Sequence, residues 1–132
     1  MNMDQENAVI YCRSANYAHG IDNDDLAQQR EHCIARANEK GYKVLEVFSD
    51  MESGNQAERP GLNTLLAYLK ESRQVELPVL IDGPSRLARN LGLFIKLSSA
   101  IREAGGSLDM PGLELEHGFS TEAKDKQEKR EG

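Results

Sequence analysis

The sequence has 132 residues and a formal net charge of −6, with 39% hydrophobic but only 5% aromatic residues. This length suits one domain with an aliphatic core that needs no disulfide or metal to fold. The acidic balance excludes a free-standing protein with a broad basic surface for nucleic acid, because phosphate neutralisation drives most such binding. Any contact with DNA is therefore expected to be local or helped by a partner.

The chain carries no predicted metal site, signal peptide or membrane span. Its two cysteines, Cys12 and Cys33, lie in a predicted strand and on a predicted helical face, which indicates buried free thiols. Three scattered histidines lack the spacing of ligands: His19, His32 and His117. The acidic N-terminus and the shortness of every apolar run predict a cytoplasmic protein without membrane contact.

Short apolar segments along the chain predict four strands, the last of them weak. They lie at residues 8–13, 43–48, 77–82 and 107–110. Amphipathic helices are predicted between them, because apolar residues recur there at helical spacing. The first begins at Asn23 or Asp24 and ends before Gly41, the second begins near Pro60, and the third ends at Gly105. This alternation predicts an α/β fold with three layers and a mainly parallel sheet of four to five strands flanked by helices.

Arginines follow three of the predicted strands. In parallel sheets, ligands bind beyond the carboxyl ends of the strands, so these arginines are expected to converge. A guanidinium group is planar and permanently charged, which suits a two-point grip on phosphate oxygens. The four candidates are Arg13, Arg59, Arg86 and Arg89. On spacing alone, ordinary surface arginines remain the favoured interpretation.

Four segments in this order and spacing resemble the serine site-specific recombinases, the resolvase/invertase family: YCRSAN, LAQQR, FSDMESGNQAERPGL and SRLARN. The resemblance covers roughly residues 8–110. Its most specific parts are D-x-x-S-G-x(4)-R-P-G-L at 50–62 and R-L-x-R at 86–89. It implies a resolvase-like catalytic domain at residues 1–118, and we expect a charged, disordered tail at 119–132.

The resemblance also implies a reaction and a set of site residues. In this family a serine hydroxyl attacks a DNA phosphodiester and forms a 5′-phosphoserine link, without a cofactor or a metal. Phosphate binding is implied for Arg13, Arg59, Arg86 and Arg89. The polar residues Gln29, Asp50 and Ser53 match further positions near the family's site.

The sequence departs from the family at the nucleophile itself. The family pattern is arginine, any residue, serine, whereas this chain has Arg13, Ser14 and Ala15. Ser14 is thus a candidate nucleophile that lies one residue early. If the strand continues, Ser14 points away from Arg13, unless a bulge or an early turn re-aims it. A second departure is Ser85, which stands where the family usually has aspartate; Asp82, three residues earlier, is not expected to replace it.

The end of the sequence departs as well. The family continues into a long dimerisation helix and a DNA-recognition domain, and residues 110–132 show the pattern of neither. Binding to DNA is therefore expected to need a partner or another domain. The expected partners are DNA, a second copy in a homodimer or higher oligomer, and an active recombinase subunit.

Three hypotheses remain open from the sequence. The first is a recombinase-like enzyme of DNA site-specific recombination that is weakly active or inactive alone, with Ser14 as its nucleophile. The second is a catalytically dead binding module that regulates or associates with a recombinase. The third is an isolated catalytic domain, or the product of a decayed mobile-element gene, with no present function; the consistent helix caps and apolar stripes argue for a folded protein. A bacterial or phage source is expected for any of them.

Overall fold

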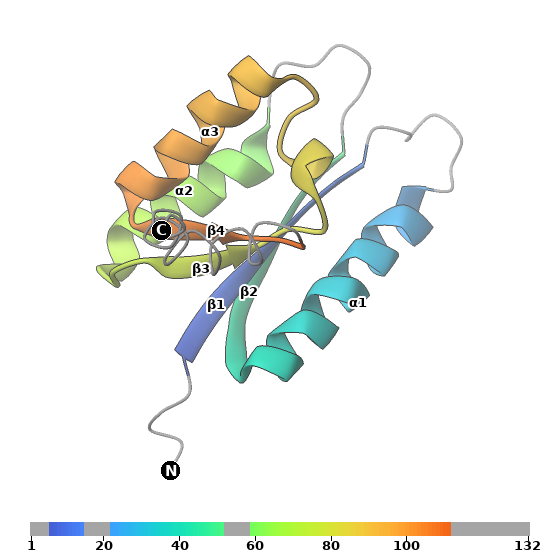
Figure 1. Cartoon of the computed structure of the whole chain (residues 1–132), viewed down its shortest axis with the longest axis horizontal. Helices are drawn as coiled ribbons and strands as arrows, with labels where there is room; N and C mark the ends of the chain where they lie inside the picture. Colours follow the sequence, from blue (N-terminus) through green and yellow to red (C-terminus); the bar gives the residue numbers. More distant parts are fainter. Residues whose placement is uncertain (1–5, 15–21, 52–58, 112–132) are drawn as a thin grey trace, which may run out of the picture.

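The computed structural model of the chain describes residues 6–14, 22–51 and 59–111. Within these ranges, four parallel strands form one sheet in the order β2-β1-β3-β4. Figure 1 shows this sheet with its central strand β1 between the helices. The strands are β1 (Glu6–Ser14), β2 (Tyr42–Met51), β3 (Leu77–Leu80) and β4 (Gly106–Asp109). The predicted three-layer α/β fold is confirmed, with four strands in the described part.

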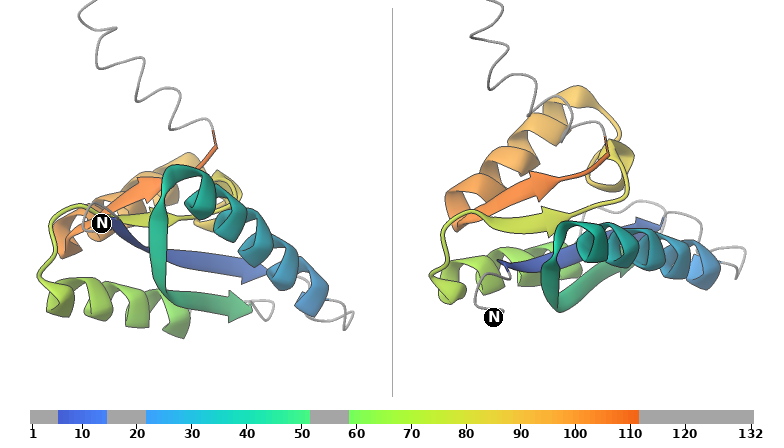
Figure 2. Two further views of the ribbon diagram at one scale, coloured as in Figure 1. Left: turned by 90° about the horizontal axis from the view of Figure 1, so that it is seen from below. Right: turned by 60° about the horizontal axis from the view of Figure 1, so that its bottom comes forward.

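Helices cover both faces of the sheet. One face is covered by α1 (Asp22–Lys40), and the other by α2 (Pro60–Ser72) and α3 (Leu91–Ala104), as the two views in Figure 2 show. A single 3₁₀ turn, η3 (Pro84–Arg86), connects β3 to α3. None of the described helices combines the length and the apolar character that crossing a membrane requires.

The central strand β1 divides the core into two halves. Val9 and Tyr11 pack with the side chains of α2 and α3, whereas Ile10 and Cys12 pack with Cys33 of α1. All four of these β1 side chains are at most 1% exposed. Because successive side chains of a strand point to opposite faces, the two halves of the core fix the direction of every side chain along β1.

The first two strands are longer than the sequence predicts. The predicted strands at 8–13 and 43–48 extend to Ser14 and Met51, because the β1–β2 ladder pairs Arg13 with Asp50 and Ser14 with Met51. Backbone pairing thus overrides the polar composition that indicated loops here. As a result, Ser14 and Asp50 lie in strands. The predicted tail at 119–132 lies outside the described residues.

Hydrogen bonds to the buried carboxylate of Asp109 connect the weak fourth strand to its neighbours. Asp109, 9% exposed, accepts hydrogen bonds from Arg36 Nε at 3.0 Å, Lys40 Nζ at 2.9 Å and the Tyr42 hydroxyl at 3.2 Å. These partners come from α1 and the start of β2. A polar residue at this position therefore joins the edge strand to the rest of the domain, although the segment is short and poorly apolar.

Both cysteines are free and buried, as the sequence predicts. Burial raises the pKa of the Cys12 thiol to about 11 and that of Cys33 to about 12, from a usual value of 9.0. Above pH 9, the unfolded chain loses thiol protons that the folded chain keeps, so the free energy of unfolding falls as the pH rises.

We predict that Cys33→Ala flattens this fall between pH 9 and 12, because one of the two retained thiol protons is no longer present. Urea denaturation at a series of pH values measures the slope. The variant loses some packing at every pH, so the readout is the slope and not the absolute stability. An unchanged slope would contradict the burial of a protonated thiol at this position.

Candidate functional site

The described members of the predicted site lie around the carboxyl ends of β1 and β3 and the turn η3. Arg13, Arg59 and Arg86 are brought together there, with Gln29 and Asp50 beside them. Arg89 is exposed and is not part of this hydrogen-bond network. Ser53 and Ala15 lie outside the described residues.

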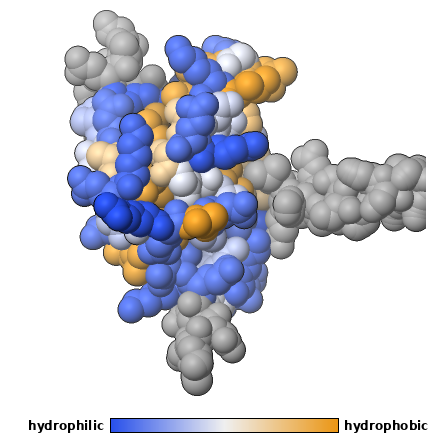
Figure 3. All heavy atoms as spheres, turned by 90° about the vertical axis from the view of Figure 1, so that its left-hand side faces the viewer, coloured by the Kyte–Doolittle hydropathy of each residue, from blue (hydrophilic) through white to orange (hydrophobic). Residues whose placement is uncertain are grey.

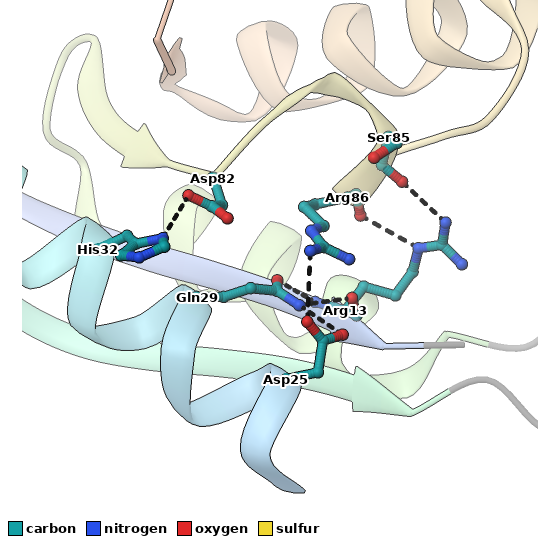
Figure 4. Close-up of polar contacts among 7 residues, drawn as sticks. All are labelled: Arg13, Asp25, Gln29, His32, Asp82, Ser85 and Arg86. Atoms are coloured by element: carbon teal, nitrogen blue, oxygen red, sulfur yellow. Dashed lines mark hydrogen bonds and ion pairs between the residues drawn. The ribbon is translucent and has the colours of Figure 1, made fainter. Parts of the chain in front are cut away.

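Arg13 holds the turn η3 against the end of β1. Its guanidinium donates from Nε to the carbonyl oxygen of Arg86 at 3.1 Å and from Nη2 to that of Ser85 at 2.9 Å. Figure 4 shows the side chain reaching across to this turn. Arg13 is only 6% exposed, so its charge is largely withdrawn from solvent. The last carbonyl oxygens of a single 3₁₀ turn have no donor within the turn. Arg13 donates hydrogen bonds to two of them, those of Ser85 and Arg86.

Arg59, directly before α2, reaches the same turn from the other side. Its Nη1 donates to the carbonyl oxygen of Leu87 at 2.6 Å, and its Nη2 donates to that of Arg86 at 3.3 Å. The guanidinium also lies 5.6 Å from the centre of the Tyr11 ring and donates to the Tyr11 hydroxyl at 2.9 Å. Two arginines therefore bind three successive carbonyl oxygens of the chain.

Asp50 links this cluster to the start of α2. Its carboxylate accepts from the backbone nitrogens of Gly61 at 2.6 Å and Leu62 at 2.9 Å, which are free donors at a helix N-terminus. A Cβ at Gly61 would overlap the carbonyl oxygen of Ser49, so only glycine allows this approach. The spacing of aspartate and glycine in the segment at 50–62 thus has a structural reason.

Tyr11 is a site residue that the sequence analysis missed. Its hydroxyl donates to Asp50 at 2.6 Å and accepts from Arg59, so it connects the two. Burial, followed by the hydrogen bond to Asp50, raises the pKa of the Tyr11 phenol well above its usual value. The sequence did carry a signal for this role. Tyr11 lies two residues before Arg13, and side chains two apart in a strand point to the same face.

From the other face of β1, Gln29 of α1 forms hydrogen bonds with the backbone of Arg13. The Gln29 side chain is 1% exposed; its Oε1 accepts from Arg13 N and its Nε2 donates to Arg13 O, both at 3.0 Å. Gln29 Nε2 also donates to Asp25 at 3.2 Å, and Asp25 forms an ion pair with Arg86 at 3.3 Å. The pairing of β1 with β3 ends at Ile10. Beyond this point, the Gln29 side chain forms the hydrogen bonds with the Arg13 backbone that a neighbouring strand would otherwise form.

Ser14 is the candidate nucleophile, and the structure places it in the interior. Its side chain is 0% exposed, and it continues the even-numbered series of Ile10 and Cys12 that faces α1. The one register shift in the β1–β2 pairing lies between Ala8 and Val9, far from Ser14. In the described part of the chain, no bulge therefore turns Ser14 toward the face of Arg13.

Ser85, at the position of the family's aspartate, and Asp82, three residues earlier, also have defined positions. Ser85 is exposed, and its contribution to the cluster is its carbonyl oxygen. Asp82, at the end of β3, contacts His32 of α1 with an oxygen–nitrogen distance of 3.2 Å (Figure 4). Asp82 thus pairs on the α1 side of the sheet.

Comparisons with known proteins agree with this fold. The family "Resolvase, N terminal domain" matches residues 8–118 of the chain. The C-terminal catalytic domain of ISC1926 TnpA, an IS607-like serine recombinase, has a TM-score of 0.65 and 31% identity, covering 79% of this chain and 68% of that one. No match was found among proteins with curated functions.

Two further structures show the same fold at lower identity. A resolvase family site-specific recombinase from Streptococcus pneumoniae has a TM-score of 0.67 and 20% identity, covering 96% of this chain and 91% of that one. The N-terminal catalytic domain of TP901-1 integrase has a TM-score of 0.61 and 22% identity, covering 80% and 75%.

The fold of this chain, a parallel sheet in the order β2-β1-β3-β4 flanked by helices, matches that of a serine recombinase catalytic domain. The chain belongs to the resolvase family, whose members act in DNA recombination.

We predict that Tyr11→Phe lowers the free energy of unfolding by about 1–3 kcal/mol, because Asp50 and Arg59 each lose a buried partner. Tyr68→Phe is the control, since Tyr68 packs edge-on against Phe48 and its hydroxyl makes no hydrogen bond in the described structure. Urea denaturation of both variants measures the difference. Equal losses in the two variants would show that the Tyr11 hydroxyl contributes nothing to the cluster.

Proposed function

We propose that this chain is a resolvase-like subunit of DNA site-specific recombination that does not cut DNA by itself. The observation that carries the proposal is the complete burial of Ser14 on the face of β1 that packs against α1. A nucleophile must come within bonding reach of the scissile phosphorus, and a side chain sealed between a sheet and a helix does not.

The arginine cluster supports retention of phosphate binding in this subunit. Arg13, Arg59 and Arg86 lie within one hydrogen-bonded group, and Arg89 follows the same turn. Hydrogen bonds from guanidinium groups to phosphate oxygens are charge-assisted and stronger than those to neutral carbonyl oxygens. A DNA phosphate is thus able to compete for donors that the turn now occupies.

The net charge bears on how the subunit meets DNA. At −6, the whole chain is repelled by the DNA backbone, so a few local arginines do not provide tight binding alone. We therefore propose that it engages DNA within a homodimer or higher oligomer, or beside another recombinase subunit that contributes recognition. The related IS607-like and TP901-1 proteins are themselves a recombinase and an integrase.

A second candidate function is a catalytically dead module that regulates an active recombinase. It is favoured by apolar side chains that α3 exposes near its start: Leu91 is 72% exposed and Ile95 is 54% exposed. Exposed apolar residues that neighbour each other on one helix are typical of protein-binding surfaces. In both functions, the chain binds without cutting.

We predict that the wild-type chain forms no covalent adduct with DNA. The substrate is a library of random-sequence duplexes with 3′-bridging phosphorothiolates, whose 3′-thiol leaving groups religate poorly and so preserve any phosphoserine link. Denaturing gels and mass spectrometry detect the adduct and map it. Ser14→Ala should behave as the wild type does.

The positive control is the double variant Ala15→Ser/Ser85→Asp, which restores both family residues at once and is expected to yield an adduct at position 15. An adduct that maps to Ser14 in the wild-type chain, and that Ser14→Ala abolishes, would overturn the proposal. Such a result would mean that the end of β1 unpairs when DNA binds.

A further inference from the structure

Arg86, one of the arginines expected to bind phosphate, is already paired with a carboxylate. Its Nη2 lies 3.3 Å from Oδ1 of Asp25, and the two side chains are 30% and 32% exposed. Arg86 ends the turn η3, whereas Asp25 lies in the first turns of α1. Figure 4 shows the carboxylate between the two elements, beneath the guanidinium.

The Asp25 carboxylate is held in this position from α1. Its second oxygen, Oδ2, accepts from Gln29 Nε2 at 3.2 Å, and Gln29 is itself fixed by two hydrogen bonds to the backbone of Arg13. One oxygen of Asp25 thus faces a buried amide and the other faces Arg86. This arrangement presents a fixed negative charge to an arginine of the site.

A carboxylate and a DNA phosphodiester each carry one negative charge and offer oxygen acceptors to the same guanidinium donors. A phosphate that binds Arg86 must therefore replace Asp25 or lie beside its like charge. Arg59 differs in this respect, because the bonds of its guanidinium group to η3 end on neutral carbonyl oxygens.

We propose that Asp25 is an internal competitor for phosphate at Arg86, and that the start of α1 thereby sets the affinity of the site for the DNA backbone. This inference rests on the proposed phosphate-binding role of the arginine cluster. It identifies α1 as the regulatory element: a displacement of its first turns, or neutralisation of Asp25, frees the guanidinium. Because Asp25 occupies Arg86, the isolated domain binds phosphate weakly.

The test uses Asp25→Asn, which removes the charge and keeps one oxygen acceptor, enough for Gln29 or for Arg86 but not for both. The matched control is Asp82→Asn, which removes one negative charge from the same edge of the sheet but contacts His32 instead of Arg86. Binding of inorganic phosphate is followed at constant ionic strength through the arginine Nε resonances in nitrogen-15 NMR spectra, with those of Arg13 and Arg59 as the readout in a chain that lacks Arg86.

We expect Asp25→Asn to bind phosphate about three- to tenfold more tightly than the wild type, as loss of a partly exposed competing ion pair implies. Asp82→Asn should stay within about twofold of the wild type. In the double variant Asp25→Asn/Arg86→Gln, the gain should disappear. Equal affinity in all chains, an equal gain in both single variants, or a gain that survives without Arg86 would overturn the proposal.

A second titration with short random-sequence duplexes separates this inference from the proposed function. If Arg86 gains one phosphate contact, Asp25→Asn should steepen the dependence of log affinity on log salt concentration by about 0.9. Tighter phosphate binding without any gain for DNA would leave Asp25 as a competitor and refute DNA binding by this site. A gain for DNA without one for phosphate would refute the competitor role of Asp25.

Discussion

The alternation of side chains along β1 is the constraint on which the site depends. This strand is buried on both faces, with Val9 and Tyr11 in one half of the core and Ile10 and Cys12 in the other. A shift of one residue would exchange the two sets and disrupt both halves. The chemical roles of positions 13, 14 and 15 are therefore not interchangeable, although the residues are adjacent in sequence.

Periodicity predicted the layers of the fold, because apolar spacing reports directly which residues a helix or strand must bury. It failed at the ends of β1 and β2, where Ser14 and Asp50 are polar residues held in strands by backbone pairing. Their side-chain contacts lie beyond the reach of a local pattern. The sequence therefore indicated loops at the positions that matter most to the site.

The sequence predicted which residues belong to the site better than it predicted how they contact one another. Arg13 and Arg59 both bind the backbone oxygen of Arg86, whose own guanidinium pairs with Asp25, and the exposed Arg89 does not join this described hydrogen-bond network. Tyr11 and Asp25 could not be identified as members, because their roles arise from partners 39 and 61 residues away. Contacts of this kind depend on how the helices pack on the sheet, which no single segment encodes.

Arg13 and Arg59 have a use in the fold itself, apart from the proposed binding of phosphate. Arg13 and Arg59 satisfy the carbonyl oxygens of residues 85–87, so removing either would leave partly buried acceptors unpaired. At position 85, by contrast, the bond to Arg13 uses the backbone oxygen and the side chain is exposed, so serine serves the turn as well as aspartate would. Retained arginines are thus a requirement of folding here as much as of phosphate binding. Loss of Arg13 or Arg59 costs the fold more than the presence of serine at position 85 does. This difference favours a chain that keeps the arginines while it departs from the family at the serine and aspartate positions.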